Sequence, residues 1–369
     1  MNMKRDTSRR ISLYLSDLDE GGAENVMVIL ANEFANRGFD VEFVLAKAVG
    51  GFIGRLSSRV KILDLRVPNK FLSLLSLIKY FQNNPSTIVL STLHVNNIMV
   101  ILAKKISMAK NIRVVVRVAT TVSAQRRVYW KKVVEKFVLS IIYPHADAVI
   151  AVSKVVAEDL VDYIGLNKEM IYPIYNPTIT SELLIKSKKE LSHPWFQPGM
   201  PPVVLGVGRL TVDKGYADLV RALAIINKIH EVNLVILGDG DQRHNLEMLA
   251  KELAIETKIE IMGFVDNPFN FMRNATVMVL PSLWEGLPNV LIEGLACHCQ
   301  IISTDSPGGV REILDNGKYG FLVPVGDPKA IAEQIQQVLN GNHLVVEPDW
   351  LKQFDVQKAT DLYLRAMGV

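Results

Sequence analysis

The stretch from Val277 to Cys297 constrains the fold more than any other part of the chain. It begins with the apolar run Val277–Leu280, which has the length and branched side chains of a buried parallel strand. From Pro288 onward the apolar residues follow a helical spacing. The stretch therefore predicts a strand, a tight loop and a helix. Open α/β sheets bind ligands at such loops, and the helix start directs free N–H groups and a positive dipole end at the ligand, which favours an anion.

Two carboxylates, Glu285 and Glu293, flank the predicted helix start with seven residues between them. An acid that points at an anion would cost energy, so we expect both to accept hydrogen bonds from neutral hydroxyls beside the anion, such as those of a sugar or a ribose. A solvated surface pair gives the same spacing, because the helix dipole alone favours a Glu early in a helix. The spacing by itself leaves both interpretations open.

Length, composition and cysteine content bound the class of protein. The chain has 369 residues, of which 49% are hydrophobic and 21% charged, as in a globular soluble chain of about two domains. Its two cysteines, Cys297 and Cys299, exclude a disulfide framework and lack the second ligand pair of a zinc site. The first apolar segment, Ile11–Leu15, is too short for a signal peptide, and no apolar run approaches the ~18 residues that span a bilayer. We therefore expect a protein of the reducing cytoplasm.

Charge divides the chain into two unlike halves. Residues 1–190 contain 27 Lys and Arg against 17 Asp and Glu, whereas residues 191–369 contain 14 against 21. The net charges of the two halves are +10 and −7. Opposite signs predict two different tasks for the two halves.

Strand and helix patterns alternate along both halves, which predicts an α/β protein with two parallel sheets, each covered by helices on both faces. The strand patterns occupy residues 11–15, 41–45, 62–65, 88–90, 114–118, 148–152 and 171–174, then 203–207, 233–237, 259–262, 277–280, 301–303 and 320–323. The helical patterns occupy residues 23–37, 71–81, 97–106, 130–143 and 153–163, then 216–229, 242–253, 269–273, 288–297, 309–314 and 328–339.

A break at Asn176-Pro177 separates the two sets, and a lysine cluster and several prolines follow it. We therefore expect an N-terminal domain 1–177, a linker 178–200 and a C-terminal domain 201–345. A last amphipathic segment, 350–367, is long enough to pack back on the N-terminal domain.

Glycines and cations follow the first strand of the second half. Gly208, Arg209 and Lys214 lie between that strand and the next helix. Glycine lets backbone approach a ligand closely, while Arg209 supplies a planar fork and Lys214 a mobile charge suited to phosphate oxygens. A tight turn with exposed cations would give the same pattern. The phosphate site is favoured because Gly238 follows the next strand in a Gly-Asp-Gly run, and the carboxylate loop follows a later one.

Three other loops carry weaker signals. Phe264 and Val265 follow a strand of the second half, where backbone either reads the edge of a nucleobase or forms a plain turn. In the first half, Gly21 and Gly22 open a helix and form either an anion cradle or a flexible loop. His94 follows the carboxyl end of a strand, where it either contacts substrate or has a structural role.

Residues 126–137 mix cations with aromatic side chains ahead of an apolar helix. Together with the basic first half, this pattern fits anionic lipid headgroups, near which each basic residue contributes about 1 kcal/mol. A solvated helix face is the alternative.

With these motifs assembled, the chain resembles the retaining glycosyltransferases of family 4, which build polysaccharides, glycolipids and lipid-linked oligosaccharides. Their GT-B architecture consists of two Rossmann-like domains that face each other across a donor-binding cleft. The resemblance is carried by Gly208-Arg209-Leu210 with Lys214-Gly215, Gly238-Asp239-Gly240, Gly263-Phe264-Val265, residues 281–293, residues 306–313 and residues 320–323. Weaker matches at residues 21–24 and 174–177 extend it over nearly the whole length.

The resemblance implies that Arg209 and Lys214 bind the donor diphosphate. It also implies that Glu285 binds the donor sugar and Glu293 the ribose hydroxyls, with Phe264 and Val265 against the base. The catalytic residues that we expect are Glu285, Lys214, Arg209 and His94, and the substrate-binding residues are Gly21, Gly22, Gly208, Gly238, Phe264, Val265, Gly286, Leu287, Pro288, Asn289 and Glu293.

One departure from the family pattern lies at the end of the central helix. The family commonly has a Cys-Gly pair after Ala296, whereas this chain has Cys297-His298. A histidine therefore stands where glycine would adopt a positive φ. We expect the change to affect the helix end and not the chemistry.

The expected activity is transfer of a hexose or N-acetylhexosamine from a nucleotide-sugar to a lipid-linked or growing glycan acceptor. A UDP-sugar is the first candidate for the donor. We expect front-face attack with retention of configuration. The cations and the helix start would stabilise the leaving diphosphate, so we expect no metal and no cofactor. The basic first half would rest on the inner leaflet of the membrane, and we expect no nucleic acid partner. The alternatives are a nucleotide-sugar epimerase of similar fold and a non-catalytic partner of a glycan-assembly complex. An NAD-dependent dehydrogenase would need a complete Gly-x-Gly-x-x-Gly motif, which the chain lacks.

Overall fold

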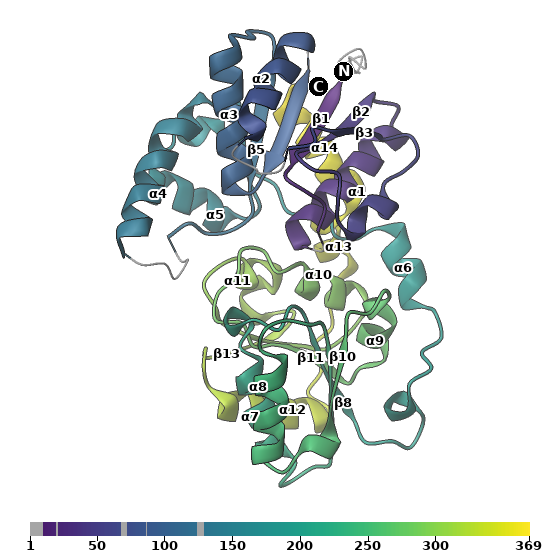
Figure 1. The fold of residues 1–369 in the computed structure, drawn as a ribbon. Helices are drawn as coiled ribbons and strands as arrows, with labels where there is room; N and C mark the ends of the chain where they lie inside the picture. The colour runs from purple at the N-terminus through teal and green to yellow at the C-terminus, as the bar shows by residue number, and fades with distance from the viewer. Residues whose placement is uncertain (1–9, 20, 68–71, 86, 124–128) are drawn as a thin grey trace. The chain divides into compact units, whose positions relative to one another are not determined.

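The computed structural model describes residues 10–369 except 20, 68–71, 86 and 124–128. Among them, residues 10–177 with 354–369 belong to one compact unit and residues 178–353 to the other. Each unit contains one wholly parallel sheet with helices around it (Figure 1). The α/β fold with two Rossmann-like sheets is thus confirmed. In the described part of the chain, no helix has the length and apolar character needed to cross a membrane.

Unit 1 contains a seven-stranded sheet in the order β3-β2-β1-β4-β5-β6-β7. Its strands are β1 Ile11–Leu15, β2 Val41–Leu45, β3 Lys61–Asp64, β4 Ile88–Thr92, β5 Arg113–Val118, β6 Ala148–Ala151 and β7 Ile171–Pro173. Its helices are α1 Gly22–Asn36, α2 Ser73–Asn83, α3 His94–Ser107, α4 Tyr129–Ile142, α5 Lys154–Asp159 and α14 Val356–Met367. The strand order reverses between β1 and β4, and open α/β sheets bind ligands at the carboxyl ends of strands beside such a switch point.

Unit 2 contains a six-stranded sheet in the order β10-β9-β8-β11-β12-β13. Its strands are β8 Val203–Val207, β9 Asn233–Leu237, β10 Ile259–Gly263, β11 Val277–Leu280, β12 Ile301–Thr304 and β13 Phe321–Val323. Its helices are α6 Ser181–Ser187, α7 Tyr216–Ile226, α8 Arg243–Glu252, α9 Pro268–Asn274, α10 Asn289–Ala296, α11 Val310–Ile313, α12 Pro328–Leu339 and α13 Pro348–Leu351. The order reverses between β8 and β11, so the predicted strand–loop–helix around β11 and α10 lies at the switch point of this sheet.

The stretch 178–200, which we expected to be a linker, contains α6 and packs against α9 within unit 2. Asn267 and Asn270 hold it there, since their side-chain amides donate to the carbonyls of Lys186 and Glu190 at 3.0 and 3.2 Å. The segment 350–367 divides into the end of α13, a short 3₁₀ turn and α14. Of these, α14 belongs to unit 1 and packs on α1 (Figure 1).

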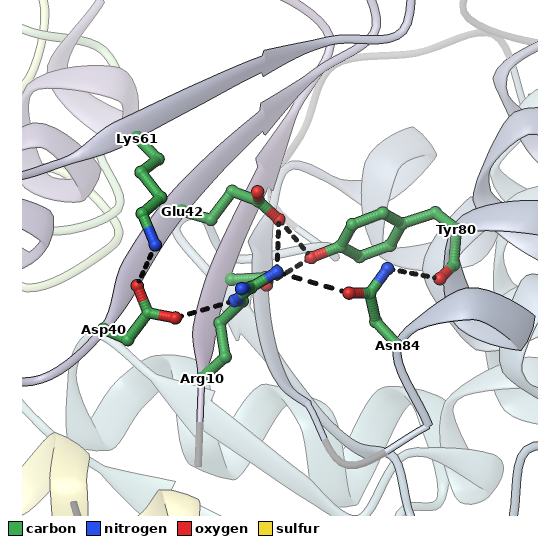
Figure 2. A network of polar contacts seen from close by, with 7 residues as sticks. Arg10, Asp40, Glu42, Lys61, Tyr80 and Asn84 are labelled. Carbon is green, nitrogen blue, oxygen red and sulfur yellow. Dashed lines mark hydrogen bonds and ion pairs between the residues drawn. The ribbon is translucent and has the colours of Figure 1, made fainter. Parts of the chain in front are cut away.

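A polar network lies at the amino-terminal ends of strands β1, β2 and β3 in unit 1 (Figure 2). Arg10, just before β1, donates to Asp40 at 2.9 Å and to Asn84 at 3.2 Å. Tyr80 on α2 donates to Glu42 on β2 at 2.6 Å. Hydrogen bonds from Lys61 and Arg10 lower the pKa of the Asp40 carboxyl. The network joins β1, β2 and α2, and we give it a structural role.

A fully buried guanidinium joins the C-terminal helix to unit 1. Arg117 at the end of β5 is 1% exposed. Its Nε donates to the Tyr363 hydroxyl of α14 at 3.1 Å, and its Nη1 and Nη2 donate to Thr92 Oγ1 at 3.0 Å and Asn176 Oδ1 at 2.6 Å. These neutral oxygens replace the water that a buried charge loses, and they link four separate parts of unit 1.

The end of α10 keeps the geometry that a glycine would give. His298 has φ 61°. The Cys299 N–H donates to the Gly294 carbonyl and the His298 N–H to the Leu295 carbonyl, both at 3.0 Å, which is the Schellman pattern. Histidine in place of the family's glycine therefore leaves the helix end intact, and His298 adopts the left-handed backbone conformation that glycine would otherwise adopt.

Replacement of His298 by glycine should therefore stabilise the protein. A left-handed non-glycine residue costs roughly 1–2 kcal/mol, part of which glycine loses again through its freer unfolded chain. We expect a net gain of about 0.5–1 kcal/mol, measured by urea unfolding of the full chain, and His298→Ala as the control should show no gain. A His298→Gly variant no more stable than wild type would contradict the assignment of strain.

Candidate functional site

Loops of unit 2 join one another at the carboxyl ends of its central strands. The loop after β8 bonds to the end of β9, because the Gly208 N–H donates to the Leu237 carbonyl at 2.9 Å. It also bonds to the loop after β11, where the Leu283 N–H donates to the Asp213 carbonyl at 2.8 Å. The Glu285 N–H in turn donates to the carbonyl of Pro307, after β12, at 2.9 Å. The phosphate and carboxylate motifs predicted from separate stretches therefore form one connected surface.

Glycines allow this close contact between loops. A Cβ added to Gly238 would lie 1.9 Å from the Gly208 carbonyl oxygen, and one added to Gly215 would lie 2.1 Å from the Pro281 carbonyl oxygen. We expected Gly208 to let backbone approach a ligand. In the structure the side where it lacks a Cβ faces Tyr216, whose hydroxyl oxygen would be 2.9 Å from that Cβ.

An ion pair joins two of these loops. Lys214 Nζ donates to Glu285 Oε1 at 2.6 Å, although the two residues are 71 positions apart. Ser282 Oγ donates to the same oxygen at 2.7 Å. The Glu285 side chain is 9% exposed and that of Lys214 is 18% exposed. The pair is therefore mostly buried but still reachable by solvent. Two predicted catalytic residues are therefore in contact, and sequence reasoning gave Ser282 no role.

The start of α10 faces the same loop. Its N-cap is Pro288, and no side chain caps the helix there. Asn289 is the first helical residue, and Thr178 donates to its side-chain oxygen at 3.5 Å. Before it, the Gly286 carbonyl accepts from the Gly309 N–H at 2.6 Å, and Leu287 is 7% exposed. Glu293 lies one turn inside the helix, as expected.

The remaining predicted donor residues of unit 2 lie towards solvent. Arg209 is exposed and Val265 is partly exposed. Phe264 is 64% exposed, and it follows Gly263, whose carbonyl accepts from the Gly238 N–H at 2.7 Å. An exposed aromatic ring beside the glycine loop is suited to stacking on a flat ring, so its expected contact with a base stays a prediction.

Three buried hydroxyls in these loops have no hydrogen-bond partner within the described residues. They belong to Thr211, Tyr216 and Ser306. Most buried polar atoms in proteins are paired, so each unpaired one calls for an explanation such as a water or a ligand. All three residues follow strands β8 or β12 of one sheet, which supports a polar ligand at this end of the sheet.

In unit 1, the predicted residues lie at the carboxyl ends of β1 and β4, beside the switch point. Gly21 is the N-cap of α1 and Gly22 its first residue. His94 is the first residue of α3, which begins three residues earlier than predicted. Ser16, after β1, donates to Asn96 in the first turn of α3 at 2.6 Å, so the two loops are in contact.

The His94 ring is fixed by a buried hydroxyl that sequence reasoning missed. His94 Nδ1 lies 2.9 Å from the Tyr143 hydroxyl, and the Asn97 amide donates to that hydroxyl at 3.2 Å. Burial raises the pKa of Tyr143, so this hydroxyl stays protonated. Tyr143 is 49 positions from His94 and follows an ordinary helical pattern, so no local signal could have identified it.

No cluster of three or more His, Cys, Asp or Glu side chains suited to a metal ion occurs among the described residues. Both cysteines are buried and unpaired with each other, and burial raises the pKa of each thiol to about 12. These thiols are therefore not reactive at neutral pH.

Two family models match the chain, one for each half. Residues 20–182 match Glycosyltransferase Family 4, and residues 187–348 match Glycosyl transferases group 1. With two Rossmann-like units, the chain has the GT-B architecture. It belongs to the glycosyltransferases that these two models describe, family 4 and group 1.

Two relatives from Campylobacter jejuni carry names that describe lipid-linked acceptors. The N-acetylgalactosamine-N,N'-diacetylbacillosaminyl-diphospho-undecaprenol 4-alpha-N-acetylgalactosaminyltransferase is 32% identical over 233 residues, which are 63% of this chain and 62% of that protein. The match thus spans less than two thirds of that relative. A GalNAc-alpha-(1->4)-GalNAc-alpha-(1->3)-diNAcBac-PP-undecaprenol alpha-1,4-N-acetyl-D-galactosaminyltransferase is 28% identical over 345 residues, which are 90% and 89% of the two chains.

Among solved structures, Anabaena HepE in complex with UDP and glucose is similar in fold. The TM-score is 0.79 at 17% identity, and the comparison covers 98% of this chain and 99% of HepE. At this identity the likeness shows the fold.

Proposed function

We propose that the chain is a retaining glycosyltransferase that moves a hexose or N-acetylhexosamine from a UDP-sugar to a lipid-linked or growing glycan acceptor, in the synthesis of cell-surface polysaccharide or glycolipid. The observation that carries the proposal is the Lys214–Glu285 pair at the carboxyl end of β11, beside the uncapped start of α10. The names of the Campylobacter jejuni relatives support the acceptor class, and the UDP and glucose in the HepE complex support the donor class.

The leaving group of this reaction is a diphosphate, on which negative charge grows as the glycosidic bond breaks. Arg209, Lys214 and the free N–H groups at the start of α10 would stabilise that charge. Three positive groups around one diphosphate supply the neutralisation that a divalent metal gives in other transferases. We therefore propose that the enzyme needs no metal and no cofactor.

Retention can arise in two ways, and in the first the acceptor attacks the face of the sugar that the diphosphate leaves. A double displacement would instead use Glu285 as a nucleophile on the far face of the sugar. In the structure Glu285 accepts from Lys214 and Ser282 through one oxygen, which lowers its nucleophilicity and leaves Oε2 to bind a donor hydroxyl. We propose front-face attack by the acceptor hydroxyl, with the leaving phosphate taking the proton. His94, Gly21 and Gly22 of unit 1 would serve the reacting sugar and the phosphate.

A transfer assay tests the proposal. Labelled UDP-hexoses and UDP-N-acetylhexosamines are incubated with undecaprenyl-diphosphate-linked glycans and with chelator present, and the product's anomeric configuration is determined. We expect UDP release coupled to a lipid-linked product with the donor's configuration. UDP-sugar converted with no acceptor present would favour the epimerase, and no UDP release with any donor would favour the non-catalytic partner.

We also propose that the protein lies at the cytoplasmic face of the membrane, with α4 of unit 1 as the contact. One face of α4 exposes Trp130, Val134, Phe137 and Ile141, which recur at helical spacing. Trp130 and Phe137 are 61% and 65% exposed. Lys131 and Lys136 are exposed on the same helix, and Lys131 Nζ lies 5.5 Å from the centroid of the Trp130 ring. An apolar stripe flanked by lysines matches the surface of an anionic bilayer.

Replacement of both aromatics, Trp130→Ser with Phe137→Ser, should weaken binding to vesicles of phosphatidylglycerol and phosphatidylethanolamine by more than tenfold. Burial of each ring contributes roughly 1.5–3 kcal/mol. Co-sedimentation measures the binding, which should also fall as salt rises. The matched control is Leu75→Ser on α2, an apolar side chain that is 72% exposed. Equal binding by the double variant and the control would exclude α4 as the contact.

A further inference from the structure

Tyr216 carries a buried hydroxyl that the proposed mechanism does not use. It is the first residue of α7 and is 2% exposed. Its hydroxyl has no hydrogen-bond partner within the described residues. A buried unpaired hydroxyl lowers stability, and phenylalanine would fill the same space without that cost.

Two glycines leave space for the Tyr216 side chain. A Cβ on Gly206 would lie 2.8 Å from the Tyr216 ring, and a Cβ on Gly208 would lie 2.9 Å from its hydroxyl oxygen. Both glycines belong to the strand end and loop that carry Arg209. The hydroxyl is therefore held beneath the loop that we assign to the donor diphosphate.

The backbone next to Tyr216 packs against the loop that carries Glu285. Lys214 and Tyr216 flank Gly215, which adopts φ 66° and packs on the carbonyl of Pro281. The next residue, Ser282, donates to Glu285. Burial raises the pKa of the Tyr216 hydroxyl, and the negative charge of Glu285 raises it further, so the hydroxyl keeps its proton at physiological pH.

A diphosphate bound by Lys214 would draw its ammonium group away from Glu285. The carboxylate is 9% exposed, so it would then need another hydrogen-bond donor besides Ser282. We propose that Tyr216 is a positioning residue of the donor site, whose hydroxyl replaces Lys214 as a hydrogen-bond donor to Glu285 when a nucleoside diphosphate binds. This inference rests on the proposed function, because that function assigns the diphosphate to Lys214.

Calorimetric titration with UDP tests the inference in four proteins: wild type, Tyr216→Phe, Glu285→Gln and the double variant. We expect Tyr216→Phe to weaken UDP binding about tenfold, as for the loss of one hydrogen bond to a charged group. In the Glu285→Gln background the same change should alter the dissociation constant less than threefold. Without nucleotide, Tyr216→Phe should unfold at the same or a higher temperature than wild type, so that weaker binding cannot come from misfolding.

The matched control is Tyr14→Phe. The Tyr14 hydroxyl is buried like that of Tyr216 but donates to Ser73 at 2.7 Å. This variant should unfold at a lower temperature and bind UDP as wild type does. The inference fails if Tyr216→Phe binds UDP as tightly as wild type, or if it weakens binding equally in both backgrounds. If wild type binds neither UDP, ADP nor GDP, the proposed function itself fails, and the inference with it.

Discussion

Replacement of Lys214 by alanine is expected to lower kcat for sugar transfer on the order of 10²–10³-fold. The side chain supplies a preorganised positive charge where the leaving diphosphate develops negative charge, and loss of one such group typically costs this much. In the structure its Nζ lies 2.6 Å from Glu285. The site is mostly shielded from water, and this shielding strengthens the attraction between the ammonium group and a bound diphosphate. Steady-state transfer of labelled sugar measures it.

Thermal unfolding of the same variant separates catalysis from stability. Lys329→Ala is the matched control, because Lys329 is 78% exposed and pairs with Glu333 on the surface of α12. The control should keep both its rate and its unfolding temperature. Transfer by Lys214→Ala at the rate of the control would remove the assigned leaving-group role.

Replacement of Arg117 by methionine should destabilise unit 1 by about 3 kcal/mol or more. The change keeps most of the side-chain volume but removes three buried hydrogen bonds, and each partner left without one costs roughly 1–3 kcal/mol. For a unit of this size the unfolding temperature should fall by roughly 6–12 °C. Differential scanning calorimetry of the full chain measures it.

The effect should be confined to the unit that contains Arg117. The transition assigned to unit 2, identified by its shift with added UDP, should keep its temperature. Arg59→Met serves as the control, because Arg59 is exposed on unit 1 and its loss should change stability by no more than about 0.5 kcal/mol. An Arg117→Met protein as stable as this control would mean that the buried network contributes nothing.

Much of the fold was predictable because apolar periodicity is a local signal. The run Val277–Leu280 was identified as a strand and forms β11, and the helical spacing after Pro288 forms α10. At His298 we expected a change in the helix end, but the residue keeps the positive φ that this position requires. The start of α3 at His94 was missed because Leu93, with φ 71°, adopts a backbone conformation that no local pattern indicates.

The contacts that organise the site could not be read from the sequence. The partner of Lys214 is 71 positions away, and that of Arg117 in α14 is 246 positions away. Such pairs form only when the tertiary fold brings distant segments of the chain together. Gly208 is an example: its ligand contact stays a prediction, while the structure adds a contact with Tyr216 that no local pattern indicates.

The most direct test of the account is the crystal structure of the protein with UDP. We expect the diphosphate within hydrogen-bond distance of Arg209, Lys214 and the first N–H groups of α10, with the ribose hydroxyls on Glu293. The Lys214–Glu285 bond should be broken or lengthened. A diphosphate bound away from these side chains, with that bond still at 2.6 Å, would contradict the central claim.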